Sequence, residues 1–277
     1  MKPDAKAVRD VVRRALVEDG ALKDVTSPIV GARPARGRFV AKQDLVLCGV
    51  DVAAEVFRQV GGRFTPKARD GAALRKGATV AAVEGPARAL LAGERTALNF
   101  LQQLSGVATL TRRFVEAARP AKVYDTRKTT PGLRLLEKYA VRCGGGHNHR
   151  VGLHDGAMIK DNHIAAIGDI EILRERVFDL ASRGLPIVIE AQTTEEAMLF
   201  ATFPVRVLML DNFPTSRLRR AVRAVRSIHP RLEIEASGGI TLETVGSVAR
   251  TGVDRVSVGA ITHSAPACDL SLEFATA

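Results

Sequence analysis

The feature that most constrains the fold is a regular alternation that begins near residue 120. Six short runs rich in β-branched and other apolar residues occur at 122–126, 157–161, 186–191, 206–211, 232–237 and 255–259. The segments between them have helical periodicity, at roughly 131–142, 168–182, 193–202, 214–227 and 241–250. Apolar strands separated by helices predict parallel βαβ units, in either a doubly wound sheet or a β/α barrel.

Polar or glycine residues at the carboxyl ends of these strands distinguish the two architectures. The ends carry Arg127 and Lys128, Lys160, Glu190, Asp211, Ser237 with Gly238 and Gly239, and Ser257 with Gly259. A barrel builds its site from the loops after many strands, whereas an open sheet concentrates its site at one switch point. We therefore predict an α/β fold with a β/α barrel, incomplete because six strands are fewer than the usual eight.

The first hundred residues lack this alternation and predict a separate α/β domain at the N-terminus. Helices are predicted at 4–18 and 51–60, and strands at 38–49 and 77–85. Residues 94–119 are predicted to form one long helix, or two abutting helices with a break near Ser105 and Gly106.

Composition limits the setting and the partners. No apolar run approaches the ~20 residues that span a bilayer, and the first residues lack the apolar core of a signal peptide. Cys48, Cys143 and Cys268 are far apart, which argues against a disulfide framework and against a CxxC metal site. We expect a cytoplasmic protein. The net charge of +11 is compatible with nucleic-acid binding, with a generally basic surface, or with a site for small polyanions.

Two strand–helix junctions are candidate phosphate sites. The sequence SGGI at 237–240 follows a predicted strand and precedes a helix, and SVGAITHS at 257–264 offers a second set of backbone N–H groups beside His263. Glycine allows close approach of an anion, and a helix N-terminus attracts it. Because barrel phosphate sites often use the last two strand–helix loops, the pair predicts a phosphate cradle.

The carboxylates and cations at the other strand ends leave several chemical roles open. Glu190 and Asp211 end consecutive strands, where they would pair with basic neighbours, hold Mg²⁺ or stabilise positive charge on a sugar ring. Lys160 suits either a Schiff base or an anion contact. The spacing of His147, His149 and His154 does not favour zinc; His149 beside Arg150 suits anion binding, and a structural role is expected for the other two.

The longest motif, YDTRKTTPGLRLLEKYAVRCGGGHNHRVGLHDGAMIKDNH at 124–163, resembles the signature of the quinolinate phosphoribosyltransferase family, also called nicotinate-nucleotide pyrophosphorylase (decarboxylating). Supporting segments are EDGALKDVTS at 18–27, LLAGERTALNFLQQLSGVAT at 90–109, MLDNF at 209–213, EASGGI at 235–240 and VDRVSVGAITHS at 253–264. A molybdenum-transport-associated branch shares the fold but departs from DTRKTTPG and IKDNH, which are intact here. The family commonly has a second acidic residue near Glu190, where this chain has Val188 and Gln192.

The resemblance implies an N-terminal α/β domain at 1–97, a barrel at 98–264, and a tail at 265–277 that returns to the first domain. It also implies a homodimer with shared active sites, or a higher oligomer built from it, in which Arg95 reaches the partner's barrel. By similarity, Arg127, Lys128, His149, Arg150 and Lys160 bind quinolinate and phosphoribosyl pyrophosphate. The remaining implied contacts are Glu190 and Asp211 toward ribose and Mg²⁺–pyrophosphate, and Ser237, Gly238, Gly239, Ser257, Gly259 and His263 toward the 5-phosphate.

The implied reaction transfers phosphoribosyl to the quinolinate nitrogen and releases pyrophosphate and CO₂, which gives nicotinate mononucleotide for NAD biosynthesis. Lys128, Lys160, Glu190 and Asp211 are the expected catalytic residues, and Mg²⁺ is the expected cofactor. Alternatives are a Schiff-base aldolase that uses Lys160, a nucleic-acid-binding protein, and a nicotinate or nicotinamide phosphoribosyltransferase. The scattered basic residues and the absence of tryptophan argue against nucleic acid as a partner.

Overall fold

The computed structural model describes residues 3–30 and 33–275, which form two compact units. The first unit comprises Met1–Arg112, Thr129–Gly145 and Ile261–Ala277, and the second comprises Arg113–Lys128 and Gly146–Ala260. Each unit combines segments that are separated in the sequence. The domain division at residues 97 and 264 stays a prediction. No helix in the described ranges combines the length and the apolar character needed to cross a membrane.

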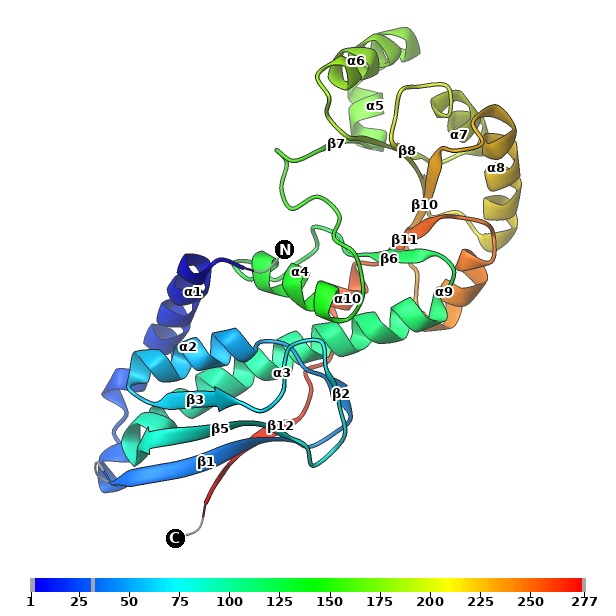
Figure 1. Ribbon diagram of the computed structural model, residues 1–277. Coiled ribbons are helices and arrows are strands. Elements are labelled where there is room, and N and C mark those ends of the chain that lie inside the picture. The colour runs from blue at the N-terminus through cyan, green and yellow to red at the C-terminus, as the bar shows by residue number, and fades with distance from the viewer. Residues whose placement is uncertain (1–2, 31–32, 276–277) are drawn as a thin grey trace. The chain divides into compact units, whose positions relative to one another are not determined.

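The first unit contains a four-stranded antiparallel sheet in the order β12-β1-β5-β3 (Figure 1). Its elements are α1 (Ala5–Glu18), the 3₁₀ helices η1 (Ala21–Lys23) and η2 (Ser27–Val30), β1 (Pro34–Ala41), β2 (Leu45–Val46), α2 (Val50–Val60), β3 (Arg63–Pro66), β4 (Ala73–Leu74), β5 (Thr79–Pro86), α3 (Ala87–Ala117), α4 (Arg134–Cys143) and β12 (Leu270–Phe274). The tail returns to this sheet, because β12 pairs with β1 in the register Phe39↔Leu272.

The core of the first unit joins the sheet to α2. Phe39 of β1 and Phe57 of α2 are fully buried and meet edge to face, with their ring centroids 5.7 Å apart. Phe64 of β3 lies 5.9 Å from Phe57 in a stacked arrangement. Burying side chains of this size contributes about 1.5–3 kcal/mol each, so the aromatic cluster anchors α2 on the sheet.

Helix α3 continues without interruption through Ser105 and Gly106, where the sequence suggested a break. Ser105 is tied to the preceding loop, since its Oγ accepts from the backbone N–H of Cys48 at 3.0 Å. A Cβ on Gly106 would lie 2.2 Å from the carbonyl oxygen of Pro266. The glycine is therefore needed for the close passage of the tail over the helix, and the prediction of one long helix is confirmed.

The second unit contains a six-stranded parallel sheet in the order β6-β11-β10-β9-β8-β7. The first strand pairs with the last, as in a barrel, but β6 and β7 are unpaired with each other, so one seam stays open. The elements are β6 (Lys122–Tyr124), β7 (Ala157–Ile159), α5 (Asp161–Ile167), α6 (Ile170–Ser182), β8 (Ile187–Ala191), α7 (Thr194–Phe200), β9 (Val207–Asp211), α8 (Thr215–Ile228), β10 (Glu233–Ser237), α9 (Leu242–Ala249), β11 (Arg255–Ser257) and, across the unit boundary, α10 (Ala260–His263). The predicted α/β class and incomplete barrel are confirmed.

The central strands of this sheet are buried along almost their whole length. All five residues of β8 and four of the five in β9 are buried, as expected for parallel strands covered on both faces. Helices α5 to α9 lie along the outer side of the curved sheet (Figure 1). Alternate residues of each strand point to the inner side of the sheet, and these residues line the cavity described below.

Candidate active site

The period of two along a strand places the polar strand ends on one inner face. Lys160 follows β7, and Asp211, Ser237 and Ser257 are the last residues of β9, β10 and β11. Adjacent parallel strands bring these positions together, since Ser237 is in register with Asp211. The apolar floor below them comprises Met158, Val188, Val207 and Met209. A polar ring above an apolar floor is therefore dictated by the strand pattern.

A cavity of about 390 Å³ opens at this end of the strands. It is lined by Thr126, Arg127, Lys128, His149, Arg150, Met158, Lys160, Met209, Asp211, Asn212, Ser237, Gly238, Gly239 and Ser257. Four of these residues are lysine or arginine and one is a carboxylate. A cavity of this size and charge suits a small ligand with several negative groups.

Two arginines in the lining, Arg127 and Arg150, are close enough for their charges to interact. Burial and the neighbouring charge of Arg127 lower the pKa of Arg150 from its ordinary value. Nε of Arg150 is buried and has no hydrogen-bond partner among the described residues, while its Nη1 donates to the carbonyl of Gly156 at 3.1 Å. Because guanidinium groups match carboxylate and phosphate in geometry, the pair is arranged for an anion.

Lys160 is held by the carboxylate of Glu190. Its Nζ lies 2.8 Å from Oε2 of Glu190, whose side chain is only 4% exposed, whereas the Lys160 side chain is 45% exposed. The carboxylate thus fixes the amine at the cavity wall while the amine stays accessible. Glu190 is absent from the lining and acts through Lys160 in this structure.

The loop after β10 has a glycine requirement set by its neighbour. Gly238 has φ +93°, and a Cβ there would lie 2.1 Å from Oδ1 of Asn212. Asn212 has φ +54° and donates its backbone N–H to Ser237 at 2.9 Å and its side-chain N–H to Asp211 at 2.6 Å. Asn212 therefore ties the loops after β9 and β10 together, and only glycine fits against it.

His149 is positioned through the backbone. The buried carboxylate of Asp125 accepts from the backbone N–H of His149 at 2.8 Å and from the side chain of Asn148 at 2.6 Å. The backbone N–H of Arg150 donates to Nδ1 of His149 at 2.8 Å, so Nδ1 is the acceptor and the neutral ring carries its proton on Nε2. Nε2 lies 3.8 Å from Oε2 of Glu235.

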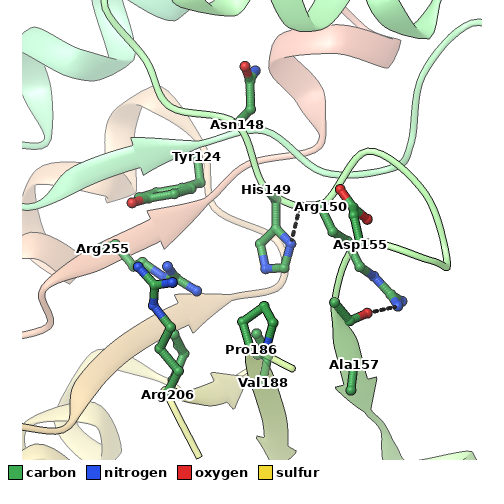
Figure 2. A pocket seen from close by; sticks show the side chains of 12 residues that line it. Tyr124, Asn148, His149, Arg150, Asp155, Ala157, Pro186, Val188, Arg206 and Arg255 are labelled. Atoms are coloured by element: carbon green, nitrogen blue, oxygen red, sulfur yellow. Dashed lines mark hydrogen bonds between the residues drawn. The ribbon is translucent and has the colours of Figure 1, made fainter. Parts of the chain in front are cut away.

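A second cavity of about 220 Å³ lies toward the other end of the strands, where Pro186 and Arg206 precede β8 and β9. His149 and Arg150 line both cavities. Figure 2 shows the ring of His149 projecting between Arg255 on one side and Arg150 on the other. His149 therefore stands at the boundary of the two spaces.

A buried ion pair supports this boundary. Nε of Arg255 lies 2.6 Å from Oε2 of Glu235, and the two side chains are 8% and 0% exposed. Arg255 also lies over the ring of Tyr124, 4.6 Å from its centroid (Figure 2). Burial raises the pKa of Glu235, and the charge of Arg255 opposes that shift.

The cavity brings together ten of the residues predicted from the sequence. These are Arg127, Lys128, His149, Arg150, Lys160, Asp211, Ser237, Gly238, Gly239 and Ser257. Arg95 is exposed on α3, and His263 is exposed in the first unit, where Nδ1 is 2.6 Å from Oγ of Ser264. Gly259 follows β11 outside the lining, so these three residues are not brought into the cavity. The chemical roles of all the site residues stay predictions.

Sequence reasoning missed four lining residues and the ion pair beneath them. Thr126, Met158, Met209 and Asn212 all lie within or beside the motifs described above. Met158 and Met209 could have been predicted from the period of two, because each lies two residues before a predicted site residue. The ring of His147 stacks on Tyr124, with centroids 5.1 Å apart, which is a structural contact. Strand period also places Glu235 and Arg255 inward, but nothing in their sequence context marks them as buried.

Comparisons with known proteins identify the family. Residues 24–105 match the quinolinate phosphoribosyl transferase N-terminal domain, and residues 107–273 match the C-terminal domain of the same family. The chain is 41% identical to a nicotinate-nucleotide pyrophosphorylase [carboxylating] of Mycobacterium leprae, over 97% of each protein. It is 38% identical to quinolinate phosphoribosyltransferase [decarboxylating] 1 of Nicotiana glauca, covering 100% of this chain and 85% of that one.

A solved structure gives the same result for the fold. The nicotinate-nucleotide pyrophosphorylase from Francisella tularensis superposes with a TM-score of 0.93 at 37% identity, covering 99% of this chain and 98% of that one. The match extends over both units, and the cationic strand-end cavity is formed by the motifs that carry the sequence resemblance. The chain therefore belongs to the quinolinate phosphoribosyltransferase family.

Proposed function

We propose that the strand-end cavity is the site at which quinolinate and phosphoribosyl pyrophosphate react. The chain is a decarboxylating quinolinate phosphoribosyltransferase, a pentosyltransferase that produces nicotinate mononucleotide, pyrophosphate and CO₂. The observation that carries the assignment of the site is the cluster of four cationic side chains facing one carboxylate, with the Arg150 guanidinium only partly satisfied. Both substrates are polyanions, and such a lining attracts them.

The residues divide between the two substrates by chemistry. Arg127, Arg150 and Lys160 offer two guanidinium forks and one ammonium to the two carboxylates of quinolinate. His149 presents Nε2–H between the arginines of the two cavities. The backbone at Ser237, Gly238 and Gly239 receives the 5-phosphate, since the glycine conformations leave its N–H groups open to an anion. Lys128 is assigned to the pyrophosphate.

The chain's own groups promote the transfer by electrostatics. As the bond from C1 of ribose to pyrophosphate lengthens, positive charge develops on the sugar, and the carboxylate of Asp211 stabilises it, while Glu190 contributes by holding Lys160 at the cavity wall. The pyridine nitrogen then attacks C1. The ring bears a positive charge after this step, which stabilises the carbanion left when the 2-carboxylate departs as CO₂. Lys160 stays against that region through its 2.8 Å contact with Glu190.

The cavity offers few protein ligands for a magnesium ion. Asp211 supplies one carboxylate at the cavity, and Glu190 supplies a second that is engaged with Lys160. Mg²⁺ is commonly held by one or two carboxylates plus substrate phosphates, so the pyrophosphate would provide most of the ligands. When bound, the ion would neutralise charge on the leaving pyrophosphate.

A substrate test decides the function. The enzyme is offered quinolinate, nicotinate or nicotinamide, each with phosphoribosyl pyrophosphate and Mg²⁺, and nicotinate mononucleotide and CO₂ are measured. Product is expected from quinolinate alone, because only quinolinate carries the second carboxylate that the paired arginines accommodate. Turnover of nicotinate at a comparable rate would contradict the assignment.

Gly238→Ala is expected to lower kcat/KM for phosphoribosyl pyrophosphate by about 100-fold, because the new Cβ displaces Asn212 and shifts the phosphate loop by about 1 Å. Steady-state kinetics on both substrates measure the effect, with the larger change in KM of the sugar donor. Gly184→Ala is the control, since Gly184 also has positive φ, +73°, but a Cβ added there would have no neighbouring atom within 4 Å. Equal losses in both variants would attribute the effect to backbone strain.

The site is further proposed to be shared in a homodimer, with Arg95 of one subunit serving the other subunit's cavity. The exposed position of Arg95 on α3 leaves its guanidinium available for such a role. Arg95→Ala and Lys160→Ala proteins, each inactive alone, are expected to regain about a quarter of wild-type activity when mixed equally, because random hybrid dimers each carry one intact site. Exchange of subunits is verified by mass, and exchange without recovered activity would refute the sharing.

A further inference from the structure

Three metal-ligating side chains converge in the first unit, apart from the residues of the cavity. Sγ of Cys48, Sγ of Cys143 and a carboxylate oxygen of Asp70 all lie within 4.8 Å of one another. Within residues 3–30 and 33–275, no other group of three or more cysteine, histidine and acidic side chains comes this close together. The sequence separates these residues widely, and no short motif announces them.

The fold brings the three ligands together from three elements. Cys48 lies between β2 and α2, Asp70 lies in the turn between β3 and β4, and Cys143 is the last residue of α4. The backbone N–H of Gly71 donates to the carbonyl of Leu47 at 2.8 Å, which fixes the Asp70 turn beside the Cys48 loop. The convergence is therefore set by backbone contacts as well as by the side chains.

Asp70 is oriented as a ligand carboxylate would be. Its Oδ1 accepts from the backbone N–H of Val50 at 3.1 Å, and its Oδ2 accepts from the hydroxyl of Tyr139 at 3.0 Å. No lysine or arginine within the described ranges forms an ion pair with it. In metal sites, hydrogen bonds of this kind orient the side chains that bind the ion. The Asp70 carboxylate has such hydrogen bonds but no cationic partner.

The two thiols lie at different depths. Cys48 is fully buried, whereas Cys143 is partly exposed. Cys143, Asp70 and Tyr139 are each partly exposed, which gives an ion a path to the buried sulfur. Two sulfurs and one carboxylate oxygen are the donors of zinc sites, whereas magnesium prefers oxygen alone.

We infer that Cys48, Asp70 and Cys143 form a binding site for a borderline-soft divalent ion, Zn²⁺ above all. Binding forms two metal–sulfur bonds and one metal–oxygen bond, and the two thiol protons pass to solvent, with no change of oxidation state. The three protein ligands leave one position of a tetrahedron open. A bound ion would join the end of α4 to the loop that precedes α2.

Cobalt(II) titration of the full-length, reduced and metal-stripped protein tests the site, because a cobalt–thiolate bond gives a near-ultraviolet charge-transfer band. We expect the band to saturate at about one ion per chain. Zinc should abolish it and magnesium should leave it unchanged. Binding releases two protons. In the pH range where both thiols of the metal-free protein are protonated, each decrease of one pH unit should therefore weaken binding by about 100-fold.

Variants separate this site from adventitious binding. Cys143→Ser and Cys48→Ala should each eliminate the band, and Tyr139→Phe should weaken cobalt binding by about 10- to 100-fold through loss of the carboxylate's outer hydrogen bond. Cys268→Ser is the matched control, since Cys268 contacts Thr109, with Sγ 3.5 Å from Oγ1, and should leave the titration unchanged. Circular dichroism confirms that each variant is folded. Absence of the band in the unaltered protein, or its persistence in the Cys143 variant, would overturn the proposal.

Discussion

Lys160→Ala should reduce kcat/KM for quinolinate by on the order of 100-fold or more, the loss expected when preorganised charge is removed from an active site. Two effects combine in this variant. The cavity loses a cation, and the carboxylate of Glu190, which is 4% exposed, loses the ammonium 2.8 Å away. A buried and uncompensated carboxylate then repels the dianionic substrate.

A double-mutant cycle separates the two effects. If the stranded carboxylate accounts for part of the loss, Lys160→Ala combined with Glu190→Gln should be more active than Lys160→Ala alone. Steady-state kinetics with both substrates provide the measurement. Lys122→Ala serves as the control, since Lys122 is exposed at the opposite end of β6, and its rate should be unchanged. A near-wild-type rate for Lys160→Ala would remove this residue from the mechanism.

Arg255→Met should lower the free energy of unfolding by about 3–5 kcal/mol, the range found when one member of a buried ion pair is deleted. Nε of Arg255 is 2.6 Å from Glu235, whose side chain has no exposure, so methionine leaves that carboxylate without a counter-charge. Urea denaturation monitored by circular dichroism measures the loss. Arg183→Met is the control, because Arg183 pairs with Asp179 on the exposed surface of α6, where ion pairs contribute little.

The pH dependence of this loss has a definite sign. Burial raises the pKa of Glu235 above its ordinary value of 4.5, so the native state keeps the proton over a window in which the unfolded state has released it. Stability therefore falls as pH rises through that window. Removing Arg255 raises the folded pKa further and widens the window. The variant should be closest to wild type near pH 5, and adding Glu235→Gln should restore part of the stability at pH 7. A deficit that is the same at both pH values would contradict this account.

Sequence alone predicted the barrel strands well because their pattern has a single physical cause. The segments predicted at 186–191, 206–211 and 232–237 are observed at 187–191, 207–211 and 233–237. Each is a short apolar run between helices, and a parallel strand covered on both faces requires that composition. The polar residues that end these strands follow from the same pattern, which is why most of the cavity lining was predicted.

The errors lie where a local signal has two meanings. The predicted strand at 157–161 ends at Ile159, and α5 begins at Asp161, because Lys160 and the side chain of His163 cap that short helix. The predicted helix at 168–182 begins at Ile170, after Gly168 with φ +71°. Strands β3 and β12 were not predicted, since each is defined by long-range pairing and not by a local apolar run.

Long-range contacts account for the remaining surprises. The spacing of the three cysteines argued only against a CxxC metal site, and tertiary structure places Cys48 and Cys143 beside Asp70. A residue's neighbours across the fold are invisible to periodicity, and the same holds for the complete burial of Glu235. Spacing arguments therefore exclude local metal motifs but not sites assembled from separate elements.

The pairings of β6 with β11 and of β1 with β12 also govern how the chain is assembled during synthesis. The register partners Val123 and Val256, and Phe39 and Leu272, join segments that leave the ribosome far apart in time. The edges of β6 and β1 must wait unpaired until those later strands arrive, and unpaired edges invite association with other chains. The first unit cannot finish folding until the last residues emerge, because it combines residues 1–112 with 261–277, and the second unit needs residues up to 260. Nascent chains stalled before residue 255 should therefore depend on chaperones more than the finished protein does.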